Sequence, residues 1–232
     1  VFSIIIPAQQ TTYIPLKYDV SGYAENNNQI KSQRISLTDN TLTPTVNAEM
    51  NASESGALNY MLPIEILKGV NNFQPNFAVA YNSQNGNGQV GWGWNIVGLS
   101  TIAKGGKSKE IDGVTIGPQY DSLDPFYLDG QRLIKISATE FATEKFSKIK
   151  ITKQTSGEFS FIVQYTDGKI AKYKEIVSGQ HYISTFIDSF NNQIHYTYSV
   201  LGSTPRLTQC SYGGTDVNSD KFYINFIFKR KK

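Results

Sequence analysis

The sequence predicts an all-β protein built from antiparallel β-hairpins, and three observations support this fold class. The 232 residues include 14 Tyr and 13 Phe, and aromatic and β-branched residues favour strands. Apolar residues recur at every second position in several stretches, as in strands with one buried face. Turn residues such as Asp-Gly and Asn-Asn separate these stretches, and no window shows a convincing helical stripe.

Length, charge and cysteine content exclude several other classes. A chain of 232 residues is one domain by default. The aromatic content of 12% and the net charge of +3 argue against a disordered chain and against a nucleic-acid partner. The only dense basic run, residues 229–232, is interpreted as a solvated tail or the cut edge of a longer chain. The single cysteine, Cys210, excludes an internal disulfide framework, and no apolar stretch reaches the roughly 18 residues of a transmembrane span.

Residues 1–55 form a polar N-terminal segment in this interpretation. The chain starts without an initiator Met, and its apolar opening, residues 1–8, fits either the remnant of a signal peptide or a first β-strand. Short alternating stretches between Ile35 and Val46 predict edge strands. The triplet that begins at Asn51 has the letters of a glycosylation acceptor, which is a common chance match.

A β-domain is predicted from residue 56 to residue 232. Residues 60–66 read as a strand, and Pro63 within it indicates an edge position or a strand start. Residues 69–75 are a turn region. In the following strand, residues 76–83, the side chains of Phe77, Val79 and Tyr81 are expected on one face.

The densest glycine segment, residues 85–100, contains a GxGxxG spacing at Gly86, Gly88 and Gly91. This spacing matches the letters of a dinucleotide-binding fingerprint, which requires a helix to begin at the third glycine. Tryptophans and further glycines follow instead, and repeated glycines disfavour a helix. The glycines are therefore interpreted as positions of sharp turning and close backbone approach.

Trp92 and Trp94 are separated by one residue, so a continuous strand would place both indoles on one face. Together with Tyr81 they suit either a buried core or a platform on which sugar rings stack. Burial is the more common role of large aromatic side chains.

Four further strand and turn patterns follow in the second half of the chain. Asp167-Gly168 is a strong hairpin signal, and Asp129-Gly130 and Asp188 to Asn192 suggest a loose repeat of strand, Asp-containing turn and strand. The alternating faces are Phe159 to Tyr165, Ile183 to Ile187, Ile194 to Tyr198, and Phe222 to Phe228.

The sequence offers few residues that point to catalysis or metal binding. His181 and His195 each lie on a predicted strand beside aromatics, where a hydrogen-bonded or exposed histidine is ordinary, and nothing local marks Cys210 as a reactive thiolate. A carboxylate pair for a hydrolase cannot be singled out among the 19 acidic residues.

Two groups of acidic residues resemble metal sites only weakly. Asp216, Asn218 and Asp220 have the spacing of the start of a calcium loop, but the glycine and the final acid of that loop are absent, so a solvated turn is expected. The second group, Asp121, Asp124 and Asp129, lies in or beside a loop, where acids are mostly hydrated.

A resemblance to a known family rests mainly on the segment from Tyr60 to Lys104. This segment is similar to the N-terminal domain of the SpvB family, which begins the B component of insecticidal Tc toxins and related RHS/YD-repeat proteins, and the similarity extends over roughly residues 56–228. The residues that carry it are Tyr81, Asn82, Ser83, Gly86, Asn87, Gly88, Gly91, Trp92, Gly93, Trp94, Gly98, Leu99 and Ser100, with Asp129 and Gly130 downstream.

The resemblance implies that the hairpins form part of an RHS-type β-shell that encloses a C-terminal toxic cargo. It implies a secreted or cell-surface protein whose partners are the rest of the shell, its cargo and other toxin-complex subunits. It carries over no catalytic residue, cofactor or metal ligand, and so implies no enzymatic activity. The alternative is a carbohydrate-binding or adhesive β-sandwich that uses Tyr81, Trp92 and Trp94.

Overall fold

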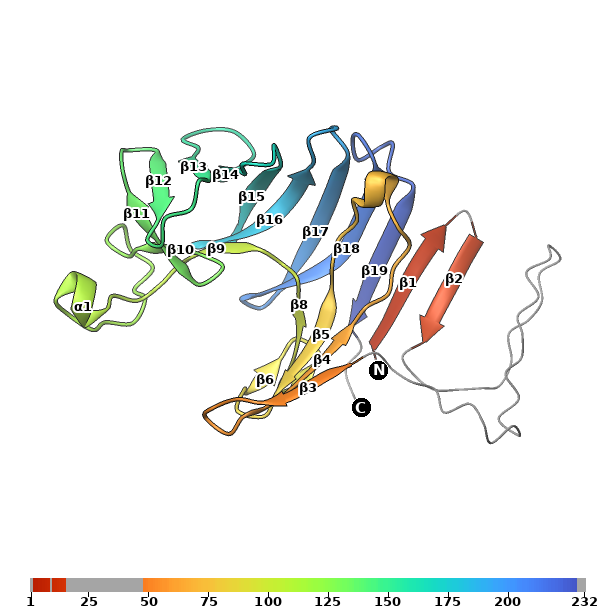
Figure 1. Cartoon of the computed structure of the whole chain (residues 1–232), viewed down its shortest axis with the longest axis horizontal. Coiled ribbons are helices and arrows are strands. Elements are labelled where there is room, and N and C mark those ends of the chain that lie inside the picture. The colour runs from red at the N-terminus through yellow and green to blue at the C-terminus, as the bar shows by residue number, and fades with distance from the viewer. Residues whose placement is uncertain (1, 9, 16–47, 229–232) are drawn as a thin grey trace.

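The computed structural model describes residues 2–8, 10–15 and 48–228, with side chains from residue 48 onward. The predicted fold class is confirmed, because two antiparallel sheets account for nearly all of the regular structure (Figure 1). The edge strands predicted between Ile35 and Val46 lie outside the described residues.

The large sheet has the order β15-β14-β13-β12-β11-β10-β9-β16-β17-β18-β19-β1-β2 among the described residues. Its strands up to β14 are β1 (Phe2–Ala8), β2 (Gln10–Pro15), β9 (Thr101–Lys104), β10 (Phe126–Leu128), β11 (Gln131–Lys135), β12 (Glu140–Thr143), β13 (Lys150–Lys153) and β14 (Phe161–Gln164). The remaining strands are β15 (Ile170–Val177), β16 (Gln180–Ile187), β17 (Gln193–Leu201), β18 (Thr204–Gly214) and β19 (Phe222–Phe228).

An additional pairing of β15 with β16 closes the strands from β9 to β16 into a ring. One edge of β16 pairs with β15, and the start of its other edge pairs with β9, where His181 lies opposite Ile102. Further along that second edge, Thr185 lies opposite His195 of β17. Closure leaves the strands of the ring without free edges over these paired stretches.

The rest of the large sheet extends away from the ring through β17, β18 and β19 (Figure 1). The apolar opening of the chain forms β1, which pairs with β19 on one side and β2 on the other. In Figure 1, β1 and β2 (red) lie at the end of the molecule opposite β11 and β12 (green).

The small sheet has the order β3-β4-β5-β8-β7-β6. Its strands are β3 (Glu49–Ala52), β4 (Leu58–Pro63), β5 (Ala78–Asn82), β6 (Asn87–Gly88), β7 (Gly91–Trp92) and β8 (Trp94–Val97).

Pro63 does not mark an edge strand, because β4 lies between β3 and β5. The prediction failed because Pro63 is the last residue of β4, two positions beyond the last residue that pairs with β3, Met61. The N–H of Ile64 points to the side of β5, where it donates to the carbonyl of Phe77. The backbone nitrogen of Pro63 therefore points to the opposite side, where β3 has already ended. The missing N–H of proline therefore breaks no ladder bond.

Phe77 joins the two sheets. Its ring is fully buried and meets Tyr196 of β17 and Phe226 of β19 edge-on, at centroid distances of 6.2 and 5.4 Å. The hydroxyl of Tyr212 on β18 donates to the carbonyl of Leu67 at 2.7 Å, which ties the loop before β5 to the large sheet. Ile96 of β8 belongs to the same buried cluster, so one face of the small sheet is covered by the large one.

In the part of the chain that the structure describes, helical structure is limited to single turns. The 3-10 turn η1 (Val70–Asn72) lies in the predicted turn region, and α1 (Lys109–Asp112) lies in the long connection from β9 to β10. Among the described residues, no helix has the length and apolar character needed to cross a membrane.

The predicted hairpin turns are confirmed. Asp129 and Gly130 have φ values of 50° and 83° and form the two-residue loop between β10 and β11, as the primed hairpin turns require. Asp167-Gly168 connects β14 to β15, and Asp188 accepts hydrogen bonds from the N–H groups of Phe190 and Asn192 between β16 and β17.

Candidate functional site

The glycine-tryptophan block, residues 81–100, occupies one end of the small sheet. Tyr81 and Asn82 end β5, Ser83 and Gly86 lie in the following turn, Asn87 and Gly88 form β6, Gly91 and Trp92 form β7, and Trp94 begins β8. The GxGxxG letters therefore fall on two short strands and their turns, where no helix begins. The interpretation of this segment as a site of sharp turning agrees with its structure.

Three glycines of this block, Gly88, Gly93 and Gly98, occupy positions that another residue cannot fill without a shift. At Gly88 a Cβ atom would lie 2.1 Å from the carbonyl oxygen of Trp94. At Gly93, φ is 77° and a Cβ atom would lie 2.5 Å from the ring of Tyr81. At Gly98, φ is 100° and a Cβ atom would lie 2.0 Å from the carbonyl oxygen of Asn76. Gly93 and Gly98 therefore combine a positive φ with direct steric exclusion.

The two tryptophans do not share one strand face. Gly93 turns the chain between them, so that β7 and β8 form a tight hairpin in which Gly91 lies opposite Trp94. Trp94 packs on Tyr81 at 5.1 Å and edge-on to Tyr60 at 6.0 Å between ring centroids, whereas Trp92 is 70% exposed. The expectation of a common face was wrong because it assumed a continuous strand, and the burial expected for large aromatics fails for Trp92.

Ser100, at the end of the glycine-tryptophan block, is joined by a hydrogen bond to Asp129 of the downstream Asp129-Gly130 turn. One carboxylate oxygen of Asp129 accepts from the Oγ of Ser100 and the other from the N–H of Thr101, both at 2.7 Å. The Oγ of Ser100 also lies 2.7 Å from the hydroxyl of Tyr173, whose pKa is raised well above its ordinary value by burial. Asp129 thus fixes the hairpin of β10 and β11 to the start of β9.

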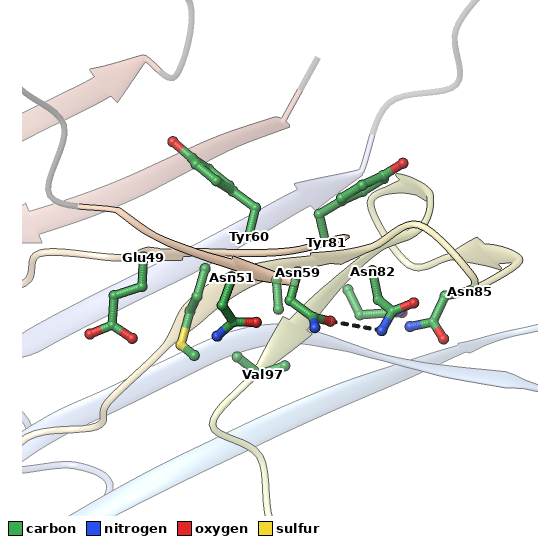
Figure 2. Close-up of a pocket in the computed structure, with 11 residues that line it drawn as sticks. Glu49, Asn51, Asn59, Tyr60, Tyr81, Asn82, Asn85 and Val97 are labelled. Atoms are coloured by element: carbon green, nitrogen blue, oxygen red, sulfur yellow. Dashed lines mark hydrogen bonds between the residues drawn. The ribbon is translucent and has the colours of Figure 1, made fainter. Parts of the chain in front are cut away.

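A groove lined by asparagines runs across the other face of the small sheet (Figure 2). Asn51, Asn59 and Asn82 are direct cross-strand neighbours on β3, β4 and β5, and the Nδ2 of Asn82 donates to the Oδ1 of Asn59 at 2.8 Å. Figure 2 shows Tyr60 and Tyr81 on the opposite side of the sheet from these amides.

The chemistry of this groove favours binding over catalysis. Its volume is about 470 Å³, and Glu49 is the one charged side chain among the described residues that line it. Neutral amides donate and accept hydrogen bonds but do not transfer protons at neutral pH. Sequence reasoning missed the groove, because only the register of the strands aligns the three asparagines.

The two histidines are engaged in separate structural contacts. The Nδ1 of His181 lies 2.8 Å from the Oγ of Ser160, and its ring packs against Phe126 and Phe161. Burial lowers the pKa of His181 to about 4, with a smaller opposing effect of Glu175 and a further lowering by nearby lysines. This histidine is neutral at physiological pH.

His195 and Cys210 lie in the second half of the large sheet. The Nδ1 of His195 is 2.8 Å from the Oδ2 of Asp220, which also accepts from the Oγ of Ser211 at 2.6 Å. Cys210 is fully buried, and burial raises the pKa of its thiol well above the ordinary value. A thiol in this state is a core side chain rather than a nucleophile.

The acidic groups do not converge on a cation. Asp216 accepts from the N–H of Asn218 within its turn, whereas Asp220 is buried against His195, so the expectation of a solvated turn is wrong for Asp220. The expectation of hydrated loop acids is likewise wrong for Asp124, which is 6% exposed and accepts from the N–H groups of Gln119 and Tyr120. Both carboxylates satisfy polar groups of the fold. The described residues contain no group of three or more His, Cys, Asp or Glu placed to hold a metal ion.

The fold resembles solved structures over about two thirds to three quarters of this chain. A crystal structure of TcdB2-TccC3 matches with a TM-score of 0.55 and 18% identity over 73% of this chain and 10% of that chain. The Photorhabdus luminescens Tc holotoxin pore matches with a TM-score of 0.53 and 19% identity over 75% of this chain and 10% of that chain. The N-terminal domain of effector protein SpvB from Salmonella typhimurium strain LT2 matches with a TM-score of 0.49 and 16% identity over 64% of this chain and 62% of that chain.

The chain therefore spans about a tenth of the length of the Tc toxin chains that it matches. No curated protein matches it. The family whose sequence model matches is described as "Salmonella virulence plasmid 65kDa B protein", and the match covers residues 52–197, more than half of the chain. The glycine-tryptophan block, the Asp129 hairpin and the closed ring all lie within this range, and the chain belongs to the SpvB family.

Proposed function

We propose that this chain is a non-enzymatic wall segment of a secreted, toxin-like RHS/YD-repeat protein. In this role its sheets join those of neighbouring segments and help to enclose a C-terminal toxic polypeptide. Its partners are the remainder of the shell, the enclosed cargo and other subunits of a toxin complex.

The observation that carries this proposal is the fold shared with short stretches of much longer chains. The matched Tc toxin chains carry this fold in about a tenth of their length. A fold that recurs as a small part of a long chain is suited to a building element, whose sheets find their neighbours in the same polypeptide.

The outermost described strands of the two sheets support the same role. β3, the outer strand of the small sheet, is exposed along all four residues, Glu49–Ala52, and pairs with β4 only among the described strands. Among the described strands, β2 is the outermost strand of the large sheet and pairs only with β1. Unpaired edges attract further strands, and natural proteins normally cover them.

The chemical groups of the described residues also support a structural role. The histidines, Cys210 and the loop acids Asp124 and Asp129 are engaged in packing or hydrogen bonds that hold strands and turns together. The alternative, a sugar platform on Tyr81, Trp92 and Trp94, is less favoured, because the exposed Trp92 stands apart from the packed pair of the other two.

A protease-protection experiment tests the proposed function. The complete reading frame that contains these codons is expressed, and its C-terminal region is compared with the same region expressed alone. We expect the C-terminal region to resist a protease concentration that digests it in isolation. Equal digestion in both contexts would contradict enclosure.

Phe161→Ala provides a variant that opens the wall, because Phe161 is a fully buried side chain of the ring. In the full-length protein it should expose the C-terminal region, whereas Phe146→Ala, at an exposed loop position, should leave protection unchanged. Protection that is unaffected by Phe161→Ala would place the enclosing wall elsewhere.

A further inference from the structure

A second cavity lies at one end of the closed ring, away from the asparagine groove. Its volume is about 370 Å³, within the range of small-molecule pockets. It lies among β10, β11, β12, β13 and the loop that precedes β10. The lining residues are Ser122, Leu123, Asp124, Pro125, Phe126, Arg132, Leu133, Ile134, Lys135, Ala138, Phe141 and Lys153.

Strand register brings lysines and phenylalanines to the same side of the ring wall. The cross-strand partners are Lys104 with Phe126, Lys135 with Phe141, and Lys153 with Phe161. Directly opposed residues of antiparallel strands project to the same face. We call this cavity, which Lys135, Lys153, Phe126 and Phe141 line, the basic pocket.

The lysines of the basic pocket lack acidic partners. Among residues 48–228, no carboxylate forms an ion pair with Lys135 or Lys153. The Nζ of Lys153 lies 5.2 Å from the centroid of the Phe126 ring, within cation–π range. Lys104 lies 5.9 Å from the same centroid and donates to the carbonyls of Tyr120 and Asp121.

The other charged groups of the pocket already have partners. Arg132 makes a two-pronged ion pair with Asp112, at 2.8 and 2.6 Å, so its charge is compensated, and only its buried Nε has no hydrogen-bond partner among the described residues. One carboxylate oxygen of Asp124 accepts two backbone N–H groups. The remaining positive charge therefore comes from Lys135 and Lys153, beside an aromatic floor.

The floor is apolar and well packed. Phe126 meets Phe141 and Phe161 edge-on at 5.9 and 5.1 Å, and His181 lies beside Phe126 and Phe161. A flat apolar group can pack on such a floor, and an anionic group beside it can accept charge-assisted hydrogen bonds from ammonium groups.

We propose that the basic pocket binds a small organic anion, with its apolar body against Phe126 and Phe141 and its carboxylate between Lys135 and Lys153. The proposal is independent of the shell function. A shell with this pocket would carry a binding site for a small carboxylate in its wall.

An NMR titration of the ¹⁵N-labelled 232-residue protein tests the proposal without any mutation. The probes are naphthoate and naphthalenemethanol, which share a two-ring apolar body and differ in the negative charge. We expect naphthoate to shift the amide signals of Phe126, Lys135, Phe141 and Lys153, and its affinity to fall as salt is added. Equal affinity for the neutral alcohol, or shifts confined to other regions, would overturn the proposal.

Substitutions of the lysines sharpen the test. Lys135→Gln and Lys153→Gln should each raise the Kd of naphthoate about 5- to 10-fold, the loss expected for one charge-assisted contact. The matched control is Lys150→Gln on the same strand as Lys153, because Lys150 is exposed and does not line the pocket. An equal loss of affinity in the control would overturn the proposal, and the amide spectrum of each variant verifies that it is folded.

Discussion

The closed ring of β9–β16 and the small sheet of β3–β8 are held together in different ways. The ring has mutually paired strands and an interior of large side chains, among them Phe126, Phe141, Phe161 and Tyr173. The small sheet has strands of two to six residues, and glycines rather than large side chains determine the path of its chain around β6, β7 and β8. The comparison shows that one family domain combines a region held mainly by apolar burial with one that also depends on the backbone geometry of its glycines.

The largest expected effect is the loss of a ring side chain. Phe161→Ala removes a fully buried ring that contacts Phe126, Phe141 and His181. We expect the free energy of unfolding to fall by about 3–5 kcal/mol, as for other buried phenylalanines. Urea unfolding followed by circular dichroism measures it. Phe146→Ala, at a position 86% exposed, is the control and should change it by less than about 0.5 kcal/mol.

The next effect tests the role of backbone geometry in the small sheet. Gly98→Ala places a Cβ atom 2.0 Å from the carbonyl oxygen of Asn76 at a φ of 100°. We expect a loss of about 2–4 kcal/mol from strain and displacement. Gly86→Ala is the matched control, because no atom lies within 4 Å of its Cβ position. Equal losses in the two variants would mean that the close approach at Gly98 does not explain the effect.

A pH effect of up to about 3 kcal/mol is expected from the ring interior. Burial lowers the pKa of His181 from the ordinary 6.5 to about 4 in the folded protein. Between these values the unfolded chain binds a proton that the folded chain does not, so stability is complete above pH 6.5 and falls as the pH drops towards 4. Unfolding of the wild type and of His181→Asn across this range measures the effect. A wild-type pH dependence no steeper than that of the variant would contradict it.

The smallest effect distinguishes the two tryptophans. Trp94→Ala removes packing against Tyr60 and Tyr81 and should cost about 1–2 kcal/mol. Trp92→Ala should cost less than about 0.5 kcal/mol, because its side chain is 70% exposed. Thermal unfolding of both variants measures the difference. Similar losses would mean that Trp92 contributes to packing in solution.

Particular residues show how far the sequence can be interpreted. The alternation of Phe161 with Val163, and of Ile194 with Tyr196, predicted buried strand faces, and these four side chains are buried. The Asp129-Gly130 and Asp167-Gly168 turns were predictable because hairpin turns need residues that tolerate positive φ. The relation of Trp92 to Trp94 was not predictable from spacing, since one glycine in the left-handed region turns the chain between them.

The sequence alone determined the all-β class, the hairpin turns and the family, because these depend on local alternation, on turn chemistry and on a dense motif of glycines and aromatics. The tertiary structure decided the closure of the ring by the pairing of β9 with β16, the alignment of Asn51, Asn59 and Asn82, and the meeting of Lys135 and Lys153 at one cavity. The physical reason is strand register, which is settled by side-chain packing between strands distant in sequence. A shift of one residue in the pairing of two strands would move every side chain of the shifted strand to the other face of the sheet. No local pattern specifies which strands become neighbours.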